Sequence, residues 1–355
     1  MELLSVTMND GVKPRSEIEG KDNSSEDKSN YKIVRKGDMV YNSMRMWQGA
    51  NGISPCDGIV SPAYTVLMPK QEINNGYFAA LFKSVTLINE FRKNSQGMTS
   101  DTWNLKYPQI ETIKVQIPSV SEQNKVSTLF SVLDARIVAQ AQLVESLKKY
   151  KRGVMQSIFH HSTQEDWKTV KLGEIFKKVS RRNTNGDIKN VITNSAEYGL
   201  IPQRDFFDKD IAVDGNTSNY YVIEEGDFVY NPRKSNTAPY GPFNRYTLKE
   251  KGIISPLYIC LVLQEDINPA YLAWYFKSDA WYRYIYDNGS QGVRHDRVSM
   301  TDDLLMGIPV SVPTVSKQKK VAEILDAVEY RLSATQGEYD TLVKLKNGFM
   351  QQLFI

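Results

Sequence analysis

Two loops of the chain carry side chains of the kinds that read the edges of DNA bases. Arginine and lysine donate hydrogen bonds to guanine, and asparagine and glutamine pair with adenine, while apolar and aromatic groups contact thymine methyl groups. The loop of residues 42–52 contains Arg45, Trp47, Gln48 and Asn51. The loop of residues 231–241 contains Arg233, Lys234, Asn236 and Tyr240. The pattern favours contact with duplex DNA, and the alternative is a pair of ordinary solvated loops.

A second pair of loops, each containing a Ser-Gln-Gly sequence, shows the same bias. The first contributes Gln96, and the second contributes Gln291, Arg294, His295 and Arg297. Base contact again competes with simple solvation. Trp103 and Trp281 are expected in the core instead, and Cys260 in a buried strand.

Common catalytic patterns are missing from the sequence. It has no GxxxxGK[ST] phosphate loop, no GxGxxG turn and no GxSxG elbow. The sequence Asn-Pro-Arg-Lys at 231–234 starts like the Asn-Pro-Pro-Tyr loop of amino-methyltransferases, but it lacks the second proline and the aromatic residue. The three histidines and two cysteines form no metal-binding spacing. The sequence therefore predicts neither a catalytic nor a metal site in the chain itself.

The segments around these loops occur twice. Residues 37–42 (Gly-Asp-Met-Val-Tyr-Asn) match 226–231 (Gly-Asp-Phe-Val-Tyr-Asn), and residues 82–84 (Phe-Lys-Ser) match 276–278. The offset grows from 189 to 195 residues within the first part of each half and then stays at 195. Such self-similarity indicates a duplicated architecture. Each half therefore consists of a globular part with loops of variable length and a tail of fixed length.

Each globular part is predicted to mix strands and helices, which makes the fold α+β. Two short strands around a Gly-Asp turn are expected in 31–42 and again in 220–231. Further strands are expected in 61–68 and 255–263, and helices in 77–92 and 271–285. The predicted domains are 1–118 and 161–313, followed by spacer helices 119–160 and 314–355.

The two tails carry the apolar spacing of long helices, with Ser121 and Ser316 as expected N-caps. The apolar positions of the first tail are Val126, Leu129, Leu133, Ile137, Val144 and Leu147. Those of the second are Val321, Ile324, Val328, Leu342, Leu345 and Phe349. A period near 3.5 residues over about five heptads is typical of a coiled coil. Two matched seams predict a mutual coiled coil, and the alternative is two amphipathic helices packed on their own domains.

Composition limits the remaining possibilities. The chain has 355 residues, 41% of them hydrophobic, and 44 Lys and Arg against 41 Asp and Glu give a net charge of +3. This balance does not by itself indicate a nucleic-acid partner, so that prediction depends on local patches. Two cysteines and the lack of a long apolar run predict a cytoplasmic protein without a membrane segment.

The chain resembles the specificity subunits of type I restriction-modification systems. The resemblance rests on Ile-Pro-Ser-Val-Ser-Glu-Gln at 117–123, on its copy Val-Pro-Thr-Val-Ser-Lys-Gln at 312–318, and on Trp-Lys-Thr-Val-Lys-Leu-Gly-Glu-Ile at 167–175. It implies two target recognition domains, each reading half of a split DNA sequence, joined by helices in an antiparallel coiled coil. It further implies a subunit that is not catalytic. Two modification subunits would bind S-adenosylmethionine and methylate adenine, and restriction subunits would use ATP and magnesium.

One departure from this pattern concerns the start of the first half. Residues 166–189 precede 191–193 in the second half, whereas residues 4–7 already correspond to that later point. We expect a first domain that is truncated at its N-terminus or completed by a separate polypeptide. Two alternatives follow, namely an assembly scaffold that binds no DNA and an inactive truncated specificity subunit. A fused enzyme of type IIG would need methyltransferase and nuclease motifs that the sequence lacks.

Overall fold

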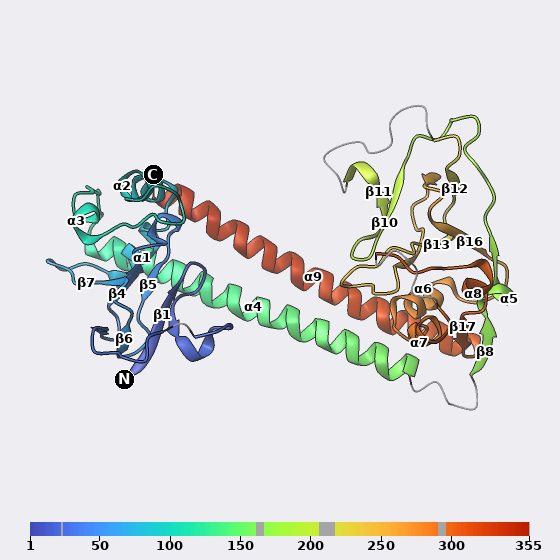
Figure 1. Ribbon diagram of the computed structural model, residues 1–355, viewed down its shortest axis with the longest axis horizontal. Coiled ribbons are helices and arrows are strands. Elements are labelled where there is room, and N and C mark those ends of the chain that lie inside the picture. Colours follow the sequence, from blue (N-terminus) through green and yellow to red (C-terminus); the bar gives the residue numbers. More distant parts are fainter. Residues whose placement is uncertain (23, 161–166, 206–216, 290–295, 355) are drawn as a thin grey trace. The chain divides into compact units, whose positions relative to one another are not determined.

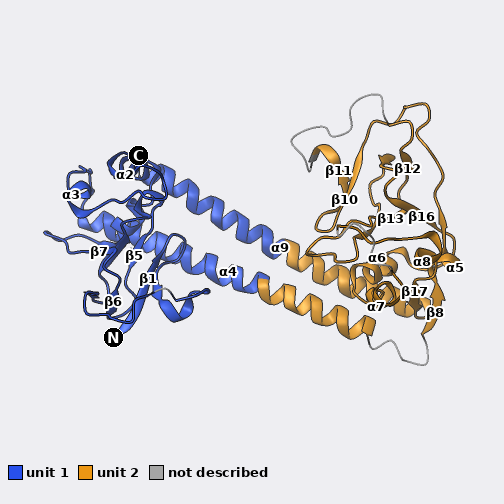
Figure 2. Ribbon diagram, in the orientation of Figure 1, with its two compact units in different colours: residues 1–144, 334–355 blue, residues 145–333 orange. Residues whose placement is uncertain are grey.

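A computed structural model describes residues 1–22, 24–160, 167–205, 217–289 and 296–354. The chain forms two compact units, Met1–Val144 with Ala334–Ile355 (unit 1) and Glu145–Ser333 (unit 2) (Figure 2). Both long helices contribute one part to each unit, because the unit boundaries fall within them. Each unit therefore contains a globular part and a stretch of paired helix.

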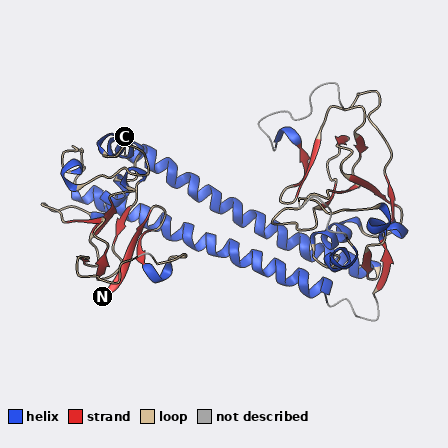
Figure 3. Ribbon diagram, in the orientation of Figure 1, coloured by secondary structure: helices blue, strands red, loops and turns tan. Residues whose placement is uncertain are grey.

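The helices and strands are labelled in Figure 1 and coloured by type in Figure 3. The α-helices are α1 (Asn75–Leu81), α2 (Val85–Asn94), α3 (Tyr107–Ile110), α4 (Val120–His160), α5 (Leu172–Ile175), α6 (Pro269–Lys277), α7 (Tyr282–Asn288), α8 (Asp302–Met306) and α9 (Val315–Leu353). The strands of unit 1 are β1 (Glu2–Thr7), β2 (Gly11–Pro14), β3 (Lys32–Val34), β4 (Met39–Asn42), β5 (Asn51–Ile53), β6 (Gly58–Val60) and β7 (Tyr64–Leu67). Those of unit 2 are β8 (Lys168–Lys171), β9 (Phe176–Lys178), β10 (Ile192–Ser195), β11 (Gly199–Pro202), β12 (Tyr221–Ile223), β13 (Phe228–Tyr230), β14 (Phe243–Arg245), β15 (Gly252–Ile254), β16 (Ile259–Leu263) and β17 (Pro309–Val312).

The two units repeat a common strand plan. In unit 1 one sheet has the order β2-β1-β6-β3 and the other β5-β4-β7. In unit 2 the hairpin β10-β11 and the pair β12-β15 correspond to the first sheet, and β14-β13-β16-β9 corresponds to the second. Unit 2 adds the antiparallel pair β17-β8. The predicted α+β duplication is confirmed, and the strands around both Gly-Asp turns form as expected.

The expected helices in 77–92 and 271–285 are each interrupted. Ser84 leaves helical geometry at ψ 148° and its Oγ accepts a hydrogen bond from the Leu87 N–H, so a new helix begins there. Ser278 is likewise extended, at ψ 171°, between α6 and α7. Trp281 and Cys260 are buried as predicted, at 0% and 2% exposed, whereas Trp103 is only half-buried.

Within each unit α4 and α9 pack as an antiparallel pair. In unit 1 the Lys346 ammonium lies 2.5 Å from the Asp134 carboxylate, and in unit 2 the Lys151 ammonium lies 2.6 Å from that of Glu329. These two ion pairs occupy corresponding positions of the duplicated halves. Gln140, at 7% exposed, donates from Nε2 to the Thr335 carbonyl over 3.1 Å. The packing agrees with the predicted coiled coil.

The phase of the seam differs from the prediction at two places, Ile324 and Leu345, while the predicted Leu129 is half-buried. Phe130 and Leu325 are buried at 4% and 0% exposed, beside the predicted Leu129 and Ile324. Ile324 and Leu345 are 50% and 46% exposed, so their prediction as seam residues was wrong. One series of buried and half-buried positions steps by three and four residues along each helix, and it includes polar side chains that an apolar pattern misses. The series is Gln123, Val126, Phe130, Leu133, Ile137, Gln140, Val144, Leu147, Lys151, Val154 and Ile158 in α4, and Gln318, Val321, Leu325, Val328, Leu332, Thr335, Tyr339, Leu342, Lys346 and Phe349 in α9.

The predicted N-caps were also misplaced by two residues. The Ser119 Oγ accepts a hydrogen bond from the Glu122 N–H, and the Glu122 carboxylate accepts one from the Ser119 N–H. This reciprocal capping box starts α4 at Val120, so Ser121 lies within the first turn. The second helix starts at Val315, which places Ser316 inside it too.

Candidate nucleic-acid interface

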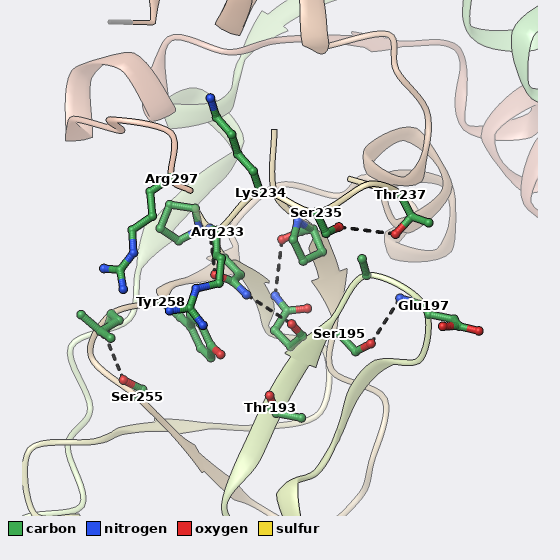
Figure 4. Close-up of a pocket in the computed structure, with 16 residues that line it drawn as sticks. Thr193, Ser195, Glu197, Arg233, Lys234, Ser235, Thr237, Ser255, Tyr258 and Arg297 are labelled. Carbon is green, nitrogen blue, oxygen red and sulfur yellow. Dashed lines mark hydrogen bonds between the residues drawn. The ribbon is translucent and has the colours of Figure 1, made fainter. Parts of the chain in front are cut away.

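Unit 2 contains a cavity of about 400 Å³ beside the ends of strands β10, β13 and β15. Its walls come from β10 and the turn after it (193–197), from the loop 231–237, from 255–258 and from Arg297. Figure 4 shows Arg233, Arg297 and Tyr258 on one side and Ser195, Glu197 and Thr237 on the other. Three cations and several hydroxyl and amide groups thus surround one opening.

The basic side is held by the main chain. Arg233 and Arg297 face each other in an antiparallel bridge, and the Lys234 N–H donates to the Asp296 carbonyl over 2.9 Å. The Asp296 carboxylate lies 3.9 Å from Arg233 Nε and 3.7 Å from Arg297 Nε. Both separations exceed the length of a normal hydrogen bond, so neither Nε atom donates a hydrogen bond to this carboxylate. The bridge places the main chains of the two arginines side by side, and both side chains line the cavity.

A buried asparagine network positions the opposite wall. Asn194, at 4% exposed, donates from Nδ2 to the Val229 carbonyl over 2.9 Å and accepts at Oδ1 from Asn244 Nδ2 over 2.7 Å. The Asn231 amide donates to the Asn194 carbonyl over 3.3 Å. These bonds tie β10 to β13 and β14. Because buried amides are costly to leave unpaired, the network resists displacement of the cavity wall.

A glycine allows the loop 231–241 to close. Gly241 has φ +84°, and a Cβ there would lie 2.0 Å from the Asn231 carbonyl oxygen. Only glycine adopts this positive φ without strain and also has no Cβ to clash with that oxygen. The Tyr230 hydroxyl also donates to the Tyr240 carbonyl over 2.6 Å, which anchors the same loop to the core.

Unit 1 has a cavity of similar size, about 400 Å³, at the corresponding place. Ser61 and Tyr64 line it where Ser255 and Tyr258 line the cavity of unit 2, and β1 takes the place of β10. The remaining lining differs between the units, since Arg15, Lys21 and Tyr31 enter from the segment between β2 and β3.

Arg15 has a structural role in that cavity. Its guanidinium donates to the carbonyls of Ile18, Gly20 and Lys21 at 2.7, 3.0 and 2.7 Å. Sequence reasoning missed these lining residues because they lie outside the matched segments of the two halves.

The predicted contact loop of unit 1 does not line this cavity. Arg45 is exposed and Gln48 half-buried, while Trp47 packs edge-to-face on Trp103, with ring centroids 5.1 Å apart. Asn51 is fully buried at 0% exposed, and its amide donates to the Gly49 carbonyl over 3.1 Å. The prediction of Asn51 as a DNA contact was wrong, because a buried amide that supports a turn cannot reach a base edge.

The predicted residues of the remaining loops have different environments. Arg233, Lys234 and Arg297 line the cavity of unit 2, whereas Asn236 and Tyr240 do not. The Tyr240 ring packs on Tyr282 at 5.0 Å between centroids, which turns it toward the core. Gln96 is exposed and pairs through its main chain with Asn104. The predicted contacts Gln291, Arg294 and His295 lie outside the described residues.

Comparison with known proteins assigns the duplicated fold. The sequence model of the type I restriction modification DNA specificity domain matches residues 5–149 and 164–343. The chain belongs to this family. Recognition of a DNA target as part of a type I restriction-modification system is therefore its function, and the specificity domain itself carries no catalytic activity.

Curated relatives agree with this assignment. The specificity subunit of the type I restriction enzyme MjaVIII from Methanocaldococcus jannaschii is 23% identical, over 90% of this chain and 79% of the relative. The EcoKI specificity subunit of Escherichia coli K12 is 19% identical, over 79% of this chain and 65% of the relative. The chain thus spans between about two thirds and four fifths of these relatives.

Solved structures share the fold. The S subunit of a type I restriction-modification system from M. genitalium aligns with a TM-score of 0.56 at 15% identity, covering 91% of this chain and 84% of that one. A chain from a study of complex assembly and conformational transition of the type I R-M system aligns with a TM-score of 0.54 at 16% identity, covering 93% and 84%. Among the described residues, no helix is long and apolar enough to span a bilayer, and no cluster of side chains is suited to a metal ion.

Proposed function

We propose that each unit reads one half of a bipartite DNA target through its cavity, the cavity of unit 2 being the better defined. The observation that carries this proposal is the pair of cavities at corresponding positions of two DNA specificity domains. In unit 2, Arg233 and Arg297 offer the paired planar donors that bind guanine O6 and N7 or a phosphate group. Because the two cavities have different linings, we expect the two half-sites to differ in sequence.

The helices α4 and α9 are proposed to set the number of base pairs between the half-sites. They have 41 and 39 residues, so each is about 60 Å long at 1.5 Å per residue. A change in helix length by whole heptads would then change the gap and leave both half-sites unaltered.

The partners proposed for the chain are duplex DNA, two modification subunits and restriction subunits. Exposed apolar side chains on the helices support a docking surface for the modification subunits. They include Val132, Val138, Ile324, Tyr330 and Leu345, which are 62%, 55%, 50%, 78% and 46% exposed. S-adenosylmethionine, ATP and magnesium would be bound by the partner subunits, and the chain itself would need no cofactor.

Selection from a pool of randomised duplexes tests the proposal. The purified complex of this chain with its cognate modification subunit should enrich a split sequence, two defined half-sites around a gap of fixed length. The variant Arg297→Ala should relax or lose one half-site only. The matched control is Arg283→Ala, which removes an 82% exposed arginine of α7 that does not line the cavity. No enrichment by a complex that still assembles would instead support an assembly scaffold.

A further inference from the structure

One wall of the unit 2 cavity ends in the turn of the hairpin β10-β11, and the hairpin β1-β2 of unit 1 has the same turn. The paired strands reach Ser195 in unit 2 and Thr7 in unit 1, and a glycine with φ +74° or +72° closes each turn. Each of these two hydroxyl groups accepts a hydrogen bond from the N–H three residues later, over 3.2 and 3.0 Å. The middle residues of the turns, Glu197 and Asn9, therefore occupy corresponding positions, and both are exposed.

The opposite wall begins in an asparagine turn that both units share. The Asn231 Oδ1 accepts a hydrogen bond from the Arg233 N–H over 3.0 Å, and the Asn42 Oδ1 accepts one from the Met44 N–H over 3.1 Å. The two asparagines end matched segments of the duplicated halves. Met44, which is 43% exposed, therefore stands where unit 2 has Arg233.

The second arginine of the cavity also lacks a cationic counterpart. In each unit the carbonyl after the turn asparagine accepts a hydrogen bond from a second segment, from the Val298 N–H over 2.9 Å in unit 2 and from the Leu105 N–H over 2.8 Å in unit 1. The residues before these donors are Arg297 and the half-buried Asn104. Unit 1 therefore has no guanidinium at either arginine position of the unit 2 cavity.

One cation of this loop is common to both units. Lys234 follows Arg233 in unit 2, and Arg45 follows Met44 in unit 1. Contacts to phosphate groups position a protein on duplex DNA without reading its sequence, so a basic residue shared by both units suits that role. Differences between the half-sites then depend on the positions that the two units do not share.

The side chains of unit 2 are complementary to a G·C base pair. In the major groove guanine offers the acceptors O6 and N7, which arginine binds, and cytosine offers an N4 amino donor, which a carboxylate binds. Arg233 and Arg297 lie on one side of the cavity and Glu197 on the other (Figure 4). A phosphate group there would be repelled by the carboxylate of Glu197 and by that of Asp296, which lies 3.9 Å from Arg233 Nε. The arrangement therefore favours a base edge over the DNA backbone.

The corresponding side chains of unit 1 are complementary to an A·T base pair. An asparagine amide pairs with adenine N6 and N7, and an apolar side chain contacts the thymine methyl group. Asn9 replaces the carboxylate of Glu197, and Met44 replaces the guanidinium of Arg233. Both differences indicate the same change of base pair, although the two residues belong to separate segments of the chain.

Both residues adjoin the cavity of unit 1 along the chain. Thr7, two residues before Asn9, lines that cavity. Asn42, two residues before Met44, pairs in register with Tyr64, which lines it as well. The segments that carry the two side chains therefore border the proposed reading site of unit 1.

We propose that the half-site read by unit 2 contains a G·C pair at the position where the half-site read by unit 1 contains an A·T pair. This inference rests on the proposed function, in which each unit reads one half-site. Arg233 and Arg297 donate to guanine, and Glu197 accepts from the cytosine amino group. In unit 1 Asn9 pairs with adenine, and Met44 contacts the thymine methyl group.

Modified bases test the inference with the unaltered chain, in its purified complex with the cognate modification subunit. The duplex is first selected from a randomised pool, and each guanine and thymine of its two half-sites is then replaced singly. Replacing guanine by 7-deazaguanine removes the N7 acceptor, and at one position of one half-site it should weaken binding at least about fivefold. Replacing thymine by uracil removes only the methyl group, and at one position of the other half-site it should weaken binding about fourfold.

Exchange variants assign these effects to the two units. In a variant with Arg233→Met, Arg297→Asn and Glu197→Asn, the loss caused by 7-deazaguanine should disappear, and selection should yield an A·T pair at that position. Met44→Arg together with Asn9→Glu should make the reverse change in the other half-site.

The matched control for a phosphate contact is Lys234→Ala. It should weaken binding to every sequence alike and lower the slope of log affinity against log salt concentration by about one. If Arg233→Met behaves in the same way and the G·C preference is retained, Arg233 contacts phosphate, and the inference is overturned while the proposed function stands. A selected split sequence in which neither modified base weakens binding would also overturn it. A complex that assembles but enriches no split sequence would overturn the proposed function as well.

Discussion

The glutamine at the start of each long helix is predicted to hold that helix on its recognition domain. Gln318 is 2% exposed, its Oε1 accepts from the Asn268 N–H over 2.8 Å, and its Nε2 donates to the Pro313 carbonyl over 2.8 Å. Asn268 in turn caps α6 through bonds to the N–H groups of Ala270 and Tyr271. One amide side chain therefore joins the starts of α9 and α6.

Replacing Gln318 by alanine leaves one buried donor and one buried acceptor unpaired. Each costs about 1–3 kcal/mol, so the local free energy of opening should fall by about 2–6 kcal/mol. That corresponds to at least roughly 30-fold, and up to about 20,000-fold, faster hydrogen exchange at the Asn268 amide. The assay is exchange of the folded chain measured by mass spectrometry or NMR.

The duplication supplies a second test of the same contact. Gln123, at 1% exposed, accepts from the Asn74 N–H over 2.9 Å and donates to the Pro118 carbonyl over 2.9 Å. Gln123→Ala should speed exchange at Asn74 by a similar factor, and the exposed Gln351→Ala should change neither amide. Exchange at Asn268 within about threefold of wild type in Gln318→Ala would refute the reasoning, because a bond that costs nothing to lose cannot fix the helix.

Three further predictions concern stability and reactivity. Gly241→Ala should destabilise unit 2 by about 2 kcal/mol or more in thermal melts, because its Cβ would lie 2.0 Å from a main-chain oxygen. Gly226→Ala is the control: a Cβ there has nothing within 4 Å, so the variant should cost only about 1 kcal/mol, from its φ of +98°. Iodoacetamide at pH 8 should modify Cys56 and spare Cys260 in the folded chain, because Cys260 is buried and burial raises the pKa of its thiol to about 12; equal labelling would contradict this. Burial and the neighbouring Lys346 ammonium lower the pKa of Lys83, so the folded chain binds the Lys83 proton less tightly than the unfolded chain does. Lys83→Met should therefore stabilise the fold at pH 7. Denaturant titrations should show that this gain in the free energy of unfolding disappears as the pH rises through the lowered pKa toward 10.5, the ordinary lysine value. A gain that grows with pH would be inconsistent with a lowered pKa.

The duplicated architecture could be predicted because its signals are local and repeated. Gly37 and Gly226 adopt φ +92° and +98° in turns where only glycine is comfortable, and both precede the expected strands. The long helices follow from a seam sustained over about five heptads. The error of one residue at Ile324 and Leu345 arose because apolar side chains also lie on the exposed faces, while Gln140, Lys151 and Lys346 occupy seam positions.

The binding surface could be predicted only in part, because it depends on how separate segments meet. Arg233, Lys234 and Arg297 were found by residue type, and the structure brings them together at one cavity. The opposite wall, including Thr193 and Glu197, has no motif of its own. Asn51 has a suitable side chain for base contact, but the fold uses it in a buried turn, which residue type alone does not reveal.

We expect this chain to direct methylation to a split DNA sequence. The most direct test is methylome sequencing of a host that expresses the chain with its cognate modification subunit, compared with the same host lacking the chain. We predict a new bipartite motif with adenine methylated in both halves. If the modification subunit co-purifies with the chain and no new methylated motif appears, the chain assembles without addressing DNA, and the expectation is contradicted.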